Sequence, residues 1–411
     1  MEYLRFGELY AIPSSNGLSR PSAVRGAGYK MVNMGELFSN GIINDIPMER
    51  VQMSDKELSK FLLEKGDLLF ARQSLVAEGA GKCSYVNDLT EETTFESHLI
   101  RVRLNPKRAI SKYFYYLFQL PNNPIKTIVN QCAQAGIRGS ELVRVKVPCP
   151  SIKVQKEIAS ILSAYDSQIE NNQKRIKLLE QMAENLYKEW FVRFRFPGFE
   201  NAEFEGGVQK GWKLERLEDF GIVLETGSRP KGGIDSSVET GVPSLGAEAI
   251  NGLAEFDYNS LKLVPQDYYD KMKRGKSKGN HILVYKDGAY IGKVTIFRNG
   301  FPFKEYSINE HVFFLNTKDC DYQNYLYFTL HQKAFFSLMK NLNRNAAQPG
   351  LSQQDMNGIK VFKPTKDVVN TFNQYAEPIF NEVFSLAKEI RLLTHQRDLL
   401  LPRLMSGKLS I

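Results

Sequence analysis

The sequence predicts an α/β (α+β) protein in which two tandem mixed α/β domains alternate with two long helices. Residues 154–191 contain no proline or glycine, and their apolar residues recur at the alternating steps of three and four that are typical of a coiled-coil seam. The same pattern returns about 214 residues later, near the end of the chain. Each helix thus supplies the apolar face that the other lacks. The two helices are expected to pack antiparallel, as a pseudo-twofold repeat.

Length and composition set the broad class of protein. A chain of 411 residues with 42% hydrophobic and 24% charged residues is typical of a folded soluble protein of two or more domains. The net charge of +8 permits a polyanionic partner. The four cysteines form no CxxC pair, which argues against a zinc site or a disulfide scaffold; they are Cys83, Cys132, Cys149 and Cys320. With no signal peptide and no apolar run of membrane-spanning length, we expect a cytoplasmic protein.

The order of the elements along the chain is domain, helix, domain, helix. Pro197 and Gly198 are expected to stop the first helix, and Pro402 is expected to interrupt the second. The expected boundaries are domain one at 1–150, the central spacer helix at 151–195, a connector at 196–211, domain two at 212–365 and the C-terminal spacer helix at 366–411.

Within the two domains, short strands and helices recur at a near-constant offset. Strands are predicted at Leu68–Ala71, His98–Arg103, Ile282–Tyr285 and Val312–Leu315, and helices at Lys112–Gln119 and Tyr322–Leu330. Gly81-Lys82 is matched by Gly292-Lys293, and His98 by His311. Each match is weak alone, but their common order predicts a tandem duplication.

The seam residues of the two helices also correspond to one another. They are Ile158, Ile169, Ile176, Leu179 and Leu186 in the first helix, and Val383, Ile390, Leu393 and Leu400 in the second. Asn172 occupies a seam position where an aliphatic residue is expected. It is either buried, where it would fix the register of the pair, or turned to solvent where a stutter shifts the seam. The sequence leaves both alternatives open.

No motif in the sequence indicates catalysis. The N-P-P-F and D-P-P-Y motifs of amino-methyltransferases are missing. Residues 78–83 resemble a phosphate-binding loop but lack its first glycine, and Cys83 stands where Ser or Thr would hold magnesium. His98 and His311 have no matched cysteine or carboxylate cluster, so we interpret them as structural residues. We therefore predict no catalytic residue and no metal site in this chain.

Basic and amide-bearing loops indicate a nucleic-acid partner. Residues 271–278 contain five cations, and the 229–233 loop is basic and rich in glycine. Lys and Arg neutralise phosphates, whereas Arg, Gln and Asn can hydrogen-bond base edges. A solvated surface is the alternative for each charged run, but the recurrence of these loops in both halves favours binding. The predicted DNA-binding residues are Arg20, Arg25, Arg72, Gln73, Lys82, Gln134, Arg138, Arg229, Lys231, Lys273, Arg274, Lys293, Asn345 and Gln348.

Two domains that are each followed by a long helix resemble the specificity (S) subunit of type I restriction-modification systems, HsdS. The resemblance covers essentially the whole chain and is strongest in LYKEWFV at 186–192 and QRDLLLPRLMSGK at 396–408. Gly211-Trp212-Lys213, followed by Leu217, is similar to the start of a target recognition domain in that family. The first half begins at Met1-Glu2-Tyr3-Leu4 without this Gly-Trp-Lys, which leaves the edge of domain one undefined.

The resemblance implies a subunit that is not itself an enzyme. Each target recognition domain would read one half of a bipartite asymmetric DNA site, and the two helices would set the gap and dock two methyltransferase (M) subunits. Those subunits methylate adenine with S-adenosylmethionine. Two restriction (R) subunits, which use ATP and Mg, can join the complex. No cofactor is expected in the chain itself.

Two other functions must be weighed. The chain could be a coiled-coil scaffold or decoy that binds methyltransferase partners without reading DNA, an alternative that the basic loops disfavour. It could also be a fused enzyme, which the missing motifs disfavour.

Overall fold

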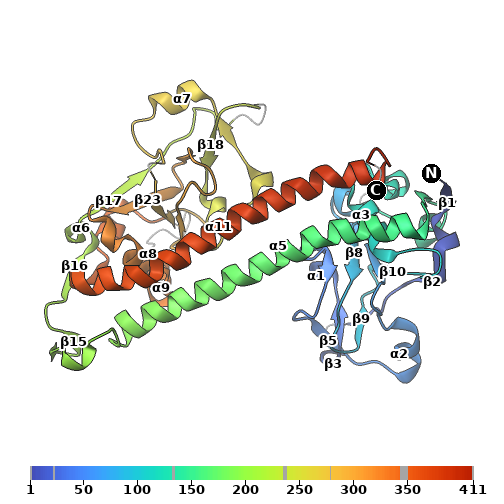
Figure 1. Cartoon of the computed structure of the whole chain (residues 1–411), viewed down its shortest axis with the longest axis horizontal. Helices are drawn as coiled ribbons and strands as arrows, with labels where there is room; N and C mark the ends of the chain where they lie inside the picture. The colour runs from blue at the N-terminus through green and yellow to red at the C-terminus, as the bar shows by residue number, and fades with distance from the viewer. Residues whose placement is uncertain are drawn as a thin grey trace. The chain divides into compact units, whose positions relative to one another are not determined.

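The computed structural model describes residues 2–21, 24–131, 135–234, 238–277, 279–342 and 350–409. The chain divides into two compact units. Unit 1 comprises Met1–Ser167 and Leu393–Ile411, and unit 2 comprises Gln168–Leu392. Two long helices, α5 (Ile152–Tyr187) and α11 (Lys366–Met405), each contribute residues to both units (Figure 1). None of the helices in the described ranges is long and apolar enough to cross a membrane.

Unit 1 is built on a five-stranded sheet. In order across the sheet, the strands are β2 (Tyr10–Asn16), β10 (Leu99–Leu104), β6 (Leu68–Ala71), β8 (Cys83–Val86) and β4 (Ile42–Ile43). Neighbouring strands are antiparallel except β4 and β8. Every residue of β6 and β8 is buried, which explains why β6 stands out in the sequence as an unbroken apolar run.

Smaller elements surround this sheet. β3 (Arg25–Val32) pairs antiparallel with β5 (Glu49–Val51) and parallel with β9 (Thr93–Phe95). A second small sheet has the order β11 (Asn130–Gln131), β12 (Ala135–Gly136) and β7 (Gln73–Ser74), and β1 (Tyr3–Arg5) pairs with β13 (Lys146–Pro148). The helices are α1 (Met34–Ser39), α2 (Asp55–Phe61), α3 (Ser111–Gln119) and α4 (Gly139–Leu142). α3 confirms the helix predicted at Lys112–Gln119, and its aromatic side chains are all buried.

Unit 2 repeats this plan. Its main sheet has the order β17 (Ile222–Thr226), β23 (Val312–Thr317), β20 (His281–Tyr285) and β21 (Val294–Phe297), all antiparallel. β18 (Val242–Leu245) pairs antiparallel with β19 (Leu263–Val264) and parallel with β22 (Ser307–Ile308). β16 (Lys213–Arg216) pairs with β24 (Lys360–Lys363), and the connector forms a hairpin of β14 (Phe204–Glu205) and β15 (Val208–Gln209). The shorter helices are α6 (Leu217–Phe220), α7 (Gln266–Lys271), α8 (Gln323–His331), α9 (Lys333–Leu342) and α10 (Gln353–Asn357).

The two units share one topology, which confirms the predicted duplication. The strand order β2-β10-β6-β8 in unit 1 matches β17-β23-β20-β21 in unit 2. The three-stranded sheet around β3 has the same one antiparallel and one parallel pairing as the sheet around β18. α3 follows β10 in unit 1, as α8 follows β23 in unit 2. The fold is therefore two tandem mixed α/β domains, each followed by a long helix.

Within unit 2, α5 and α11 run antiparallel. A short π-helical segment (Lys188–Val192) continues α5. Its Trp190 packs edge-on against Phe372, which lies early in α11, with ring centroids 5.8 Å apart. Arg175, further back in α5, pairs with Glu382, further along α11. In unit 1, Ile158 and Leu401 are buried in one core, and Arg397 Nη1 lies 2.7 Å from Asp166 Oδ1. This order of contacts is the one that antiparallel helices produce.

All of the predicted aliphatic seam residues are buried or half-buried. Ile158, Ile169, Ile176 and Val383 are buried, and Leu179, Leu186, Ile390, Leu393 and Leu400 are half-buried. The expected interruption at Pro402 is wrong, because α11 continues through it to Met405. A proline inside a helix removes one backbone donor. Here Leu401, Leu404 and Met405 are buried in the core of unit 1, which offsets that loss.

The structure also decides between the two alternatives for Asn172. Its side chain is fully buried. Its Oδ1 accepts a hydrogen bond of 3.2 Å from Gln168 Nε2, whereas its Nδ2 has no partner among the residues described. A buried donor without an acceptor costs roughly 1–3 kcal/mol. Asn172 therefore lowers the stability of the seam. That it fixes the register of the pair stays a prediction.

Asn172→Leu should stabilise unit 2. Leucine has a similar volume and carries no donor, so we expect the free energy of unfolding to rise by about 1–2 kcal/mol. Denaturant unfolding of the full chain measures this change. As a control, Gln168→Leu removes the partner but leaves the Asn172 donor buried, and it should not stabilise the chain. A loss of stability in Asn172→Leu would contradict this account.

Candidate nucleic-acid interface

In unit 1, three chain segments meet at Arg72. The 72–82 loop joins β6 to β8 and is closed at its base by two backbone bonds: Gly81 N donates to Ala71 O (2.8 Å), and Ala71 N donates to Lys82 O (2.9 Å). Arg72 N donates to His98 O (2.8 Å), and Arg72 O accepts from Ile137 N (2.9 Å). The loop is thereby fixed to the start of β10 and to the segment after β12.

The 286–293 loop of unit 2, which joins β20 to β21, is held in the same way. Gly292 N donates to Tyr285 O (3.0 Å), and Tyr285 N donates to Lys293 O (2.8 Å). Lys286 N donates to His311 O (3.0 Å), and Lys286 O accepts from Leu351 N (2.9 Å). We call these four backbone bonds, present in each unit, the loop frame. The frame makes Lys286 the counterpart of Arg72 and His311 the counterpart of His98.

A close backbone crossing brings a further segment to each loop frame. A Cβ added at Gly17 would lie 2.1 Å from Phe95 O, and one added at Gly227 would lie 1.7 Å from Ile308 O. Only glycine allows the chain to pass so near. The crossing holds residues 17–20 beside the start of β10, which His98 precedes. In unit 2 it brings Arg229 within 2.6 Å of Glu310, next to His311.

Three of the predicted side chains in unit 1 are brought together with free polar groups. Gln73 pairs with Gly136 between β7 and β12, and Arg138 follows two residues later. Within the described part of unit 1, no hydrogen bond or ion pair involves the side chains of Arg72, Gln73 or Arg138. Gln134 lies outside the described residues. Two guanidinium groups and one amide thus lie close together along the backbone, without a protein partner among the described residues.

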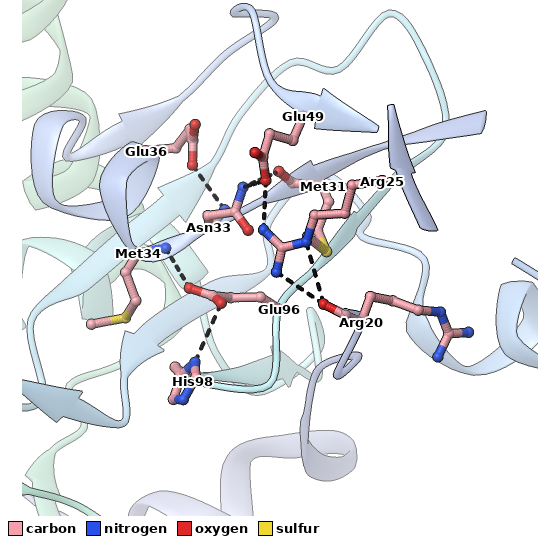
Figure 2. A network of polar contacts seen from close by, with 9 residues as sticks. All are labelled: Arg20, Arg25, Met31, Asn33, Met34, Glu36, Glu49, Glu96 and His98. Atoms are coloured by element: carbon pink, nitrogen blue, oxygen red, sulfur yellow. Dashed lines mark hydrogen bonds and ion pairs between the residues drawn. The ribbon is translucent and has the colours of Figure 1, made fainter. Parts of the chain in front are cut away.

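Arg20 and Arg25 are instead held by carboxylates, and Figure 2 shows the contacts of Arg25. Arg20 pairs with Glu57. The pKa of the Glu57 carboxyl falls to about 2, mainly because of the hydrogen bond from the Ser54 backbone N–H and next because of Arg20. Arg25 Nη1 donates to Glu49 (2.6 Å), while its Nε and Nη2 donate to the Arg20 carbonyl oxygen (3.3 and 3.2 Å). These contacts neutralise part of the positive charge of Arg20 and Arg25. Less of that charge is available to a DNA phosphate than the sequence suggests.

Both Gly-Lys lysines are half-buried and lie over an aromatic ring. Lys82 Nζ donates to Phe38 O (2.8 Å) and lies over the Phe38 ring. Lys293 Nζ lies over the Tyr290 ring and lines a cavity of about 470 Å³ together with Lys188 and His331. The two Gly-Lys pairs correspond because Lys82 and Lys293 each end the loop frame of their unit.

In unit 2, a chain of alternating charges crosses the loop frame. Lys286 Nζ lies 2.8 Å from Asp287 Oδ2, and His311 Nδ1 lies 3.1 Å from the same oxygen. His311 Nε2 is 3.5 Å from Glu310, which also pairs with Arg229. Lys286, Asp287 and Glu310 were not among the residues predicted from the sequence. The 214-residue offset was the available signal, because it aligns residue 286 with Arg72.

The remaining predicted residues of unit 2 differ in how well they are placed. Lys231, Lys273 and Arg274 are exposed, and no ion pair forms at any of them within the described ranges. A Cβ on Gly275 would lie 2.5 Å from Gly227 Cα, so Lys273 and Arg274 lie beside the backbone crossing. Asn345 and Gln348 lie outside the described residues.

Two groups of potential metal ligands lie elsewhere, one at Glu180, Glu184 and His331, the other at Asp319, Cys320 and Asp321. Glu184 is already paired with Lys188 (3.1 Å), and its hydrogen bond from His331 is the main reason that the pKa of its carboxyl falls to about 2. Of the two matched histidines, His98 lies 3.3 Å from one carboxylate, Glu96, whereas His311 contacts two, Asp287 and Glu310. Their interpretation as structural residues stays a prediction.

Gly17→Ala and Gly227→Ala should each destabilise the unit that contains them. The added methyl group would overlap a backbone carbonyl, which should lower the free energy of unfolding by about 1–3 kcal/mol. Gly35→Ala is the matched control, because nothing lies within 4 Å of its Cβ position. Thermal unfolding measures all three variants. An unchanged midpoint in Gly17→Ala and Gly227→Ala would contradict the close crossing.

Comparisons with known proteins agree with the two-unit architecture. A family model described as the type I restriction modification DNA specificity domain matches residues 22–181 and again residues 209–368. The specificity subunit of the type I restriction enzyme MjaIX from Methanocaldococcus jannaschii is 26% identical over 367 residues, which cover 87% of this chain and 80% of that protein.

Two further comparisons span nearly the whole chain. The specificity subunit of the type I restriction enzyme HindI from Haemophilus influenzae is 20% identical over 92% of this chain and 94% of that protein. The crystal structure of the S subunit of a type I restriction-modification system from M. genitalium has a similar fold, with a TM-score of 0.57 at 16% identity. It covers 98% of this chain and 95% of that one.

Proposed function

Because the chain belongs to the family of type I restriction-modification DNA specificity proteins, we propose that it is the DNA-reading subunit of such a complex, each domain recognising one half of a bipartite asymmetric site. The observation that carries this proposal is the loop frame. One backbone arrangement occurs twice and presents Arg72 and Gln73 in unit 1 but Lys286 and Asp287 in unit 2. Two domains that share a backbone arrangement but present different side chains are suited to recognise two different DNA sequences.

The side chains offered by the two frames have different base preferences. Arginine pairs well with guanine and glutamine with adenine, whereas a carboxylate accepts from the amino group of cytosine. Arg72 and Gln73 therefore favour purines in the first half-site. Asp287, which Lys286 and His311 hold in place, is suited to a cytosine in the second half-site. Exposed cations such as Arg138, Lys231 and Lys273 would position the duplex through its phosphates.

We assign the two long helices to spacing and docking. α5 has 36 residues, a length of about 54 Å, and it continues from residues of unit 1 into residues of unit 2 without a break. It carries exposed apolar side chains at Leu178 and Met182, and α11 carries others at Leu392 and Leu399. Such exposed side chains offer contact to further helices, which supports docking of two methyltransferase (M) subunits.

In this proposal catalysis belongs to the partners. The M subunits would use S-adenosylmethionine to methylate adenine, and two restriction (R) subunits would supply ATP- and Mg-dependent cleavage. This chain would contribute recognition and no cofactor. The loop residues described above form hydrogen-bonding and charged surfaces, which suits recognition.

Exchange of residues 1–150 for the equivalent domain of another family member should change one half-site only. The measurement is sequencing of methylated adenines in DNA modified by the exchanged chain together with its M subunits. The unaltered half-site and the gap serve as internal controls. A change in both halves would count against independent readers. A chain that binds M subunits yet shifts no DNA in a gel would instead be a scaffold or decoy.

Alanine variants should separate base contacts from phosphate contacts. Arg72→Ala and Gln73→Ala should reduce sequence preference in the first half-site, whereas Lys231→Ala should weaken binding to all sequences. It should also lower the slope of log K against log salt by about one. Lys82→Ala is the comparison variant, because Lys82 faces Phe38, and its salt slope should not change. Equal effects of all four variants would disprove this assignment.

Adding one heptad to α5 and one to α11 should lengthen the unspecified gap. Seven residues add about 10 Å of helix, close to three base pairs at about 3.4 Å each. Sequencing of methylated sites reads the gap directly. An insertion in α5 alone is the control, since it misaligns the seam and should impair assembly. Retention of the original gap after the matched insertions would rule out a spacing role.

A further inference from the structure

Each loop frame carries an uncovered apolar side chain. Leu75, in the 72–82 loop, is 87% exposed, and its neighbour Val76 is 59% exposed. Tyr290, in the 286–293 loop, is 63% exposed. Isolated exposed apolar residues are ordinary on protein surfaces. These stand out because they occupy the same connection between paired strands in both units, beside the side chains to which we assign base reading.

The loops hold these side chains outward by local contacts. Ser74 Oγ accepts from Val76 N (3.2 Å), and a Cβ on Gly79 would lie 2.2 Å from the same oxygen, so the turn at Leu75 is tight. In unit 2, Tyr290 O accepts from Lys293 N (3.0 Å). The Tyr290 ring meets the Tyr285 ring edge-on, with centroids 6.2 Å apart. Local contacts therefore fix the turn at Leu75 and the Tyr290 ring, and both side chains remain exposed.

The surroundings of these residues favour DNA over a protein as the occupant. Leu75 follows Arg72 and Gln73 on its loop, and the loop frame joins this loop to the segment that contains Arg138. Tyr290 lies under the Lys293 ammonium, on the loop that begins with Lys286. A protein interface has a contiguous apolar centre that is depleted in charge. One or two apolar side chains beside cations instead match a groove, where phosphates surround base edges and thymine methyl groups.

We propose that Leu75, with Val76, and Tyr290 are apolar probes that enter a DNA groove and contact bases, one probe for each half-site. This inference rests on the proposed function and adds to it a contact that carries no charge. Leu75 would cover a thymine methyl group, and the Tyr290 ring would pack on a base by its face. Each probe would make recognition depend on apolar contact as well as on hydrogen bonds.

The test uses the full chain purified with its M subunits and duplexes that contain the methylated site. The variants are Leu75→Ser with Val76→Ser, Tyr290→Ala and Tyr290→Phe. Tyr3→Ala is the matched control, because Tyr3 is also 63% exposed but lies in β1. We expect the serine pair and Tyr290→Ala to weaken specific binding about tenfold or more, each with relaxed preference in its own half-site. Tyr290→Phe and Tyr3→Ala should bind as the parent does.

Salt dependence separates this contact from an indirect effect on the cations. Apolar contacts release no counterions, so the slope of log K against log salt should remain that of the parent. Replacing thymine by uracil in the first half-site should weaken the parent and leave the serine pair unaffected. Circular dichroism melting, which should be unchanged for such exposed positions, excludes misfolding as the cause of weaker binding.

Two failures can be told apart. If the parent complex methylates specific sites but the serine pair and Tyr290→Ala bind them with unchanged affinity and preference, the apolar probes are wrong and the proposed function stands. A lower salt slope in these variants would equally overturn the probes. If the parent binds M subunits but no DNA, the proposed function fails, and the probes fail with it.

Discussion

The mutual burial of apolar faces on α5 and α11 is the constraint on which the rest of the structure depends. In unit 2, Trp190 and Phe191 of the α5 continuation both contact the Phe372 ring of α11. Phe372 and Phe380 also contact Phe328 of α8, so the helix pair and the domain share one core. In unit 1, Ile158 and Leu404 are buried in the core that holds α3. Neither long helix could remain folded with its apolar stripe in water. Their packing fixes each domain to the helix that follows it.

The elements that could be predicted from the sequence are those with a regular spacing of apolar residues or a second copy along the chain. The coiled-coil stripe repeats every three or four residues, and the second copy of each motif follows at a near-constant offset, so the fold class could be predicted without a structure. The burial of Asn172 and the uninterrupted helix at Pro402 could not. Both depend on whether neighbouring apolar residues gain enough by burial to offset a lost hydrogen bond, and that balance is a tertiary property.

The candidate interface was predictable in a similar, partial way. Arg72, Gln73 and Arg138 were identified by residue type, and the structure brings their backbones together. Arg20 and Arg25 have the same chemistry, but carboxylates distant in sequence, Glu57 and Glu49, hold them. Charge pairing of this kind is invisible in a linear sequence. Lys286 and Asp287 were missed because they carry no motif of their own, and only their place in the loop frame reveals them.

The loop frame also explains how one fold can serve two different recognition tasks. Its four bonds involve only backbone atoms, so the side chains that it presents can change without cost to the frame itself. Gly17 and Gly227 add a second constraint that is independent of recognition, because they are required by the approach of two backbones. The residues that fix the geometry are thus separate from those that would contact bases, which allows specificity to vary while the domain stays folded.

The central claim, that the side chains on the two loop frames determine the two half-sites, is tested most directly by transplanting one pair of residues. In the chain with Arg72→Lys and Gln73→Asp, unit 1 presents the side chains of Lys286 and Asp287. Sequencing of the adenines methylated by this variant and its M subunits gives the result. We predict a changed first half-site, with the second half-site and the gap as in the parent. An unchanged first half-site, with methylation as efficient as in the parent, would contradict the claim.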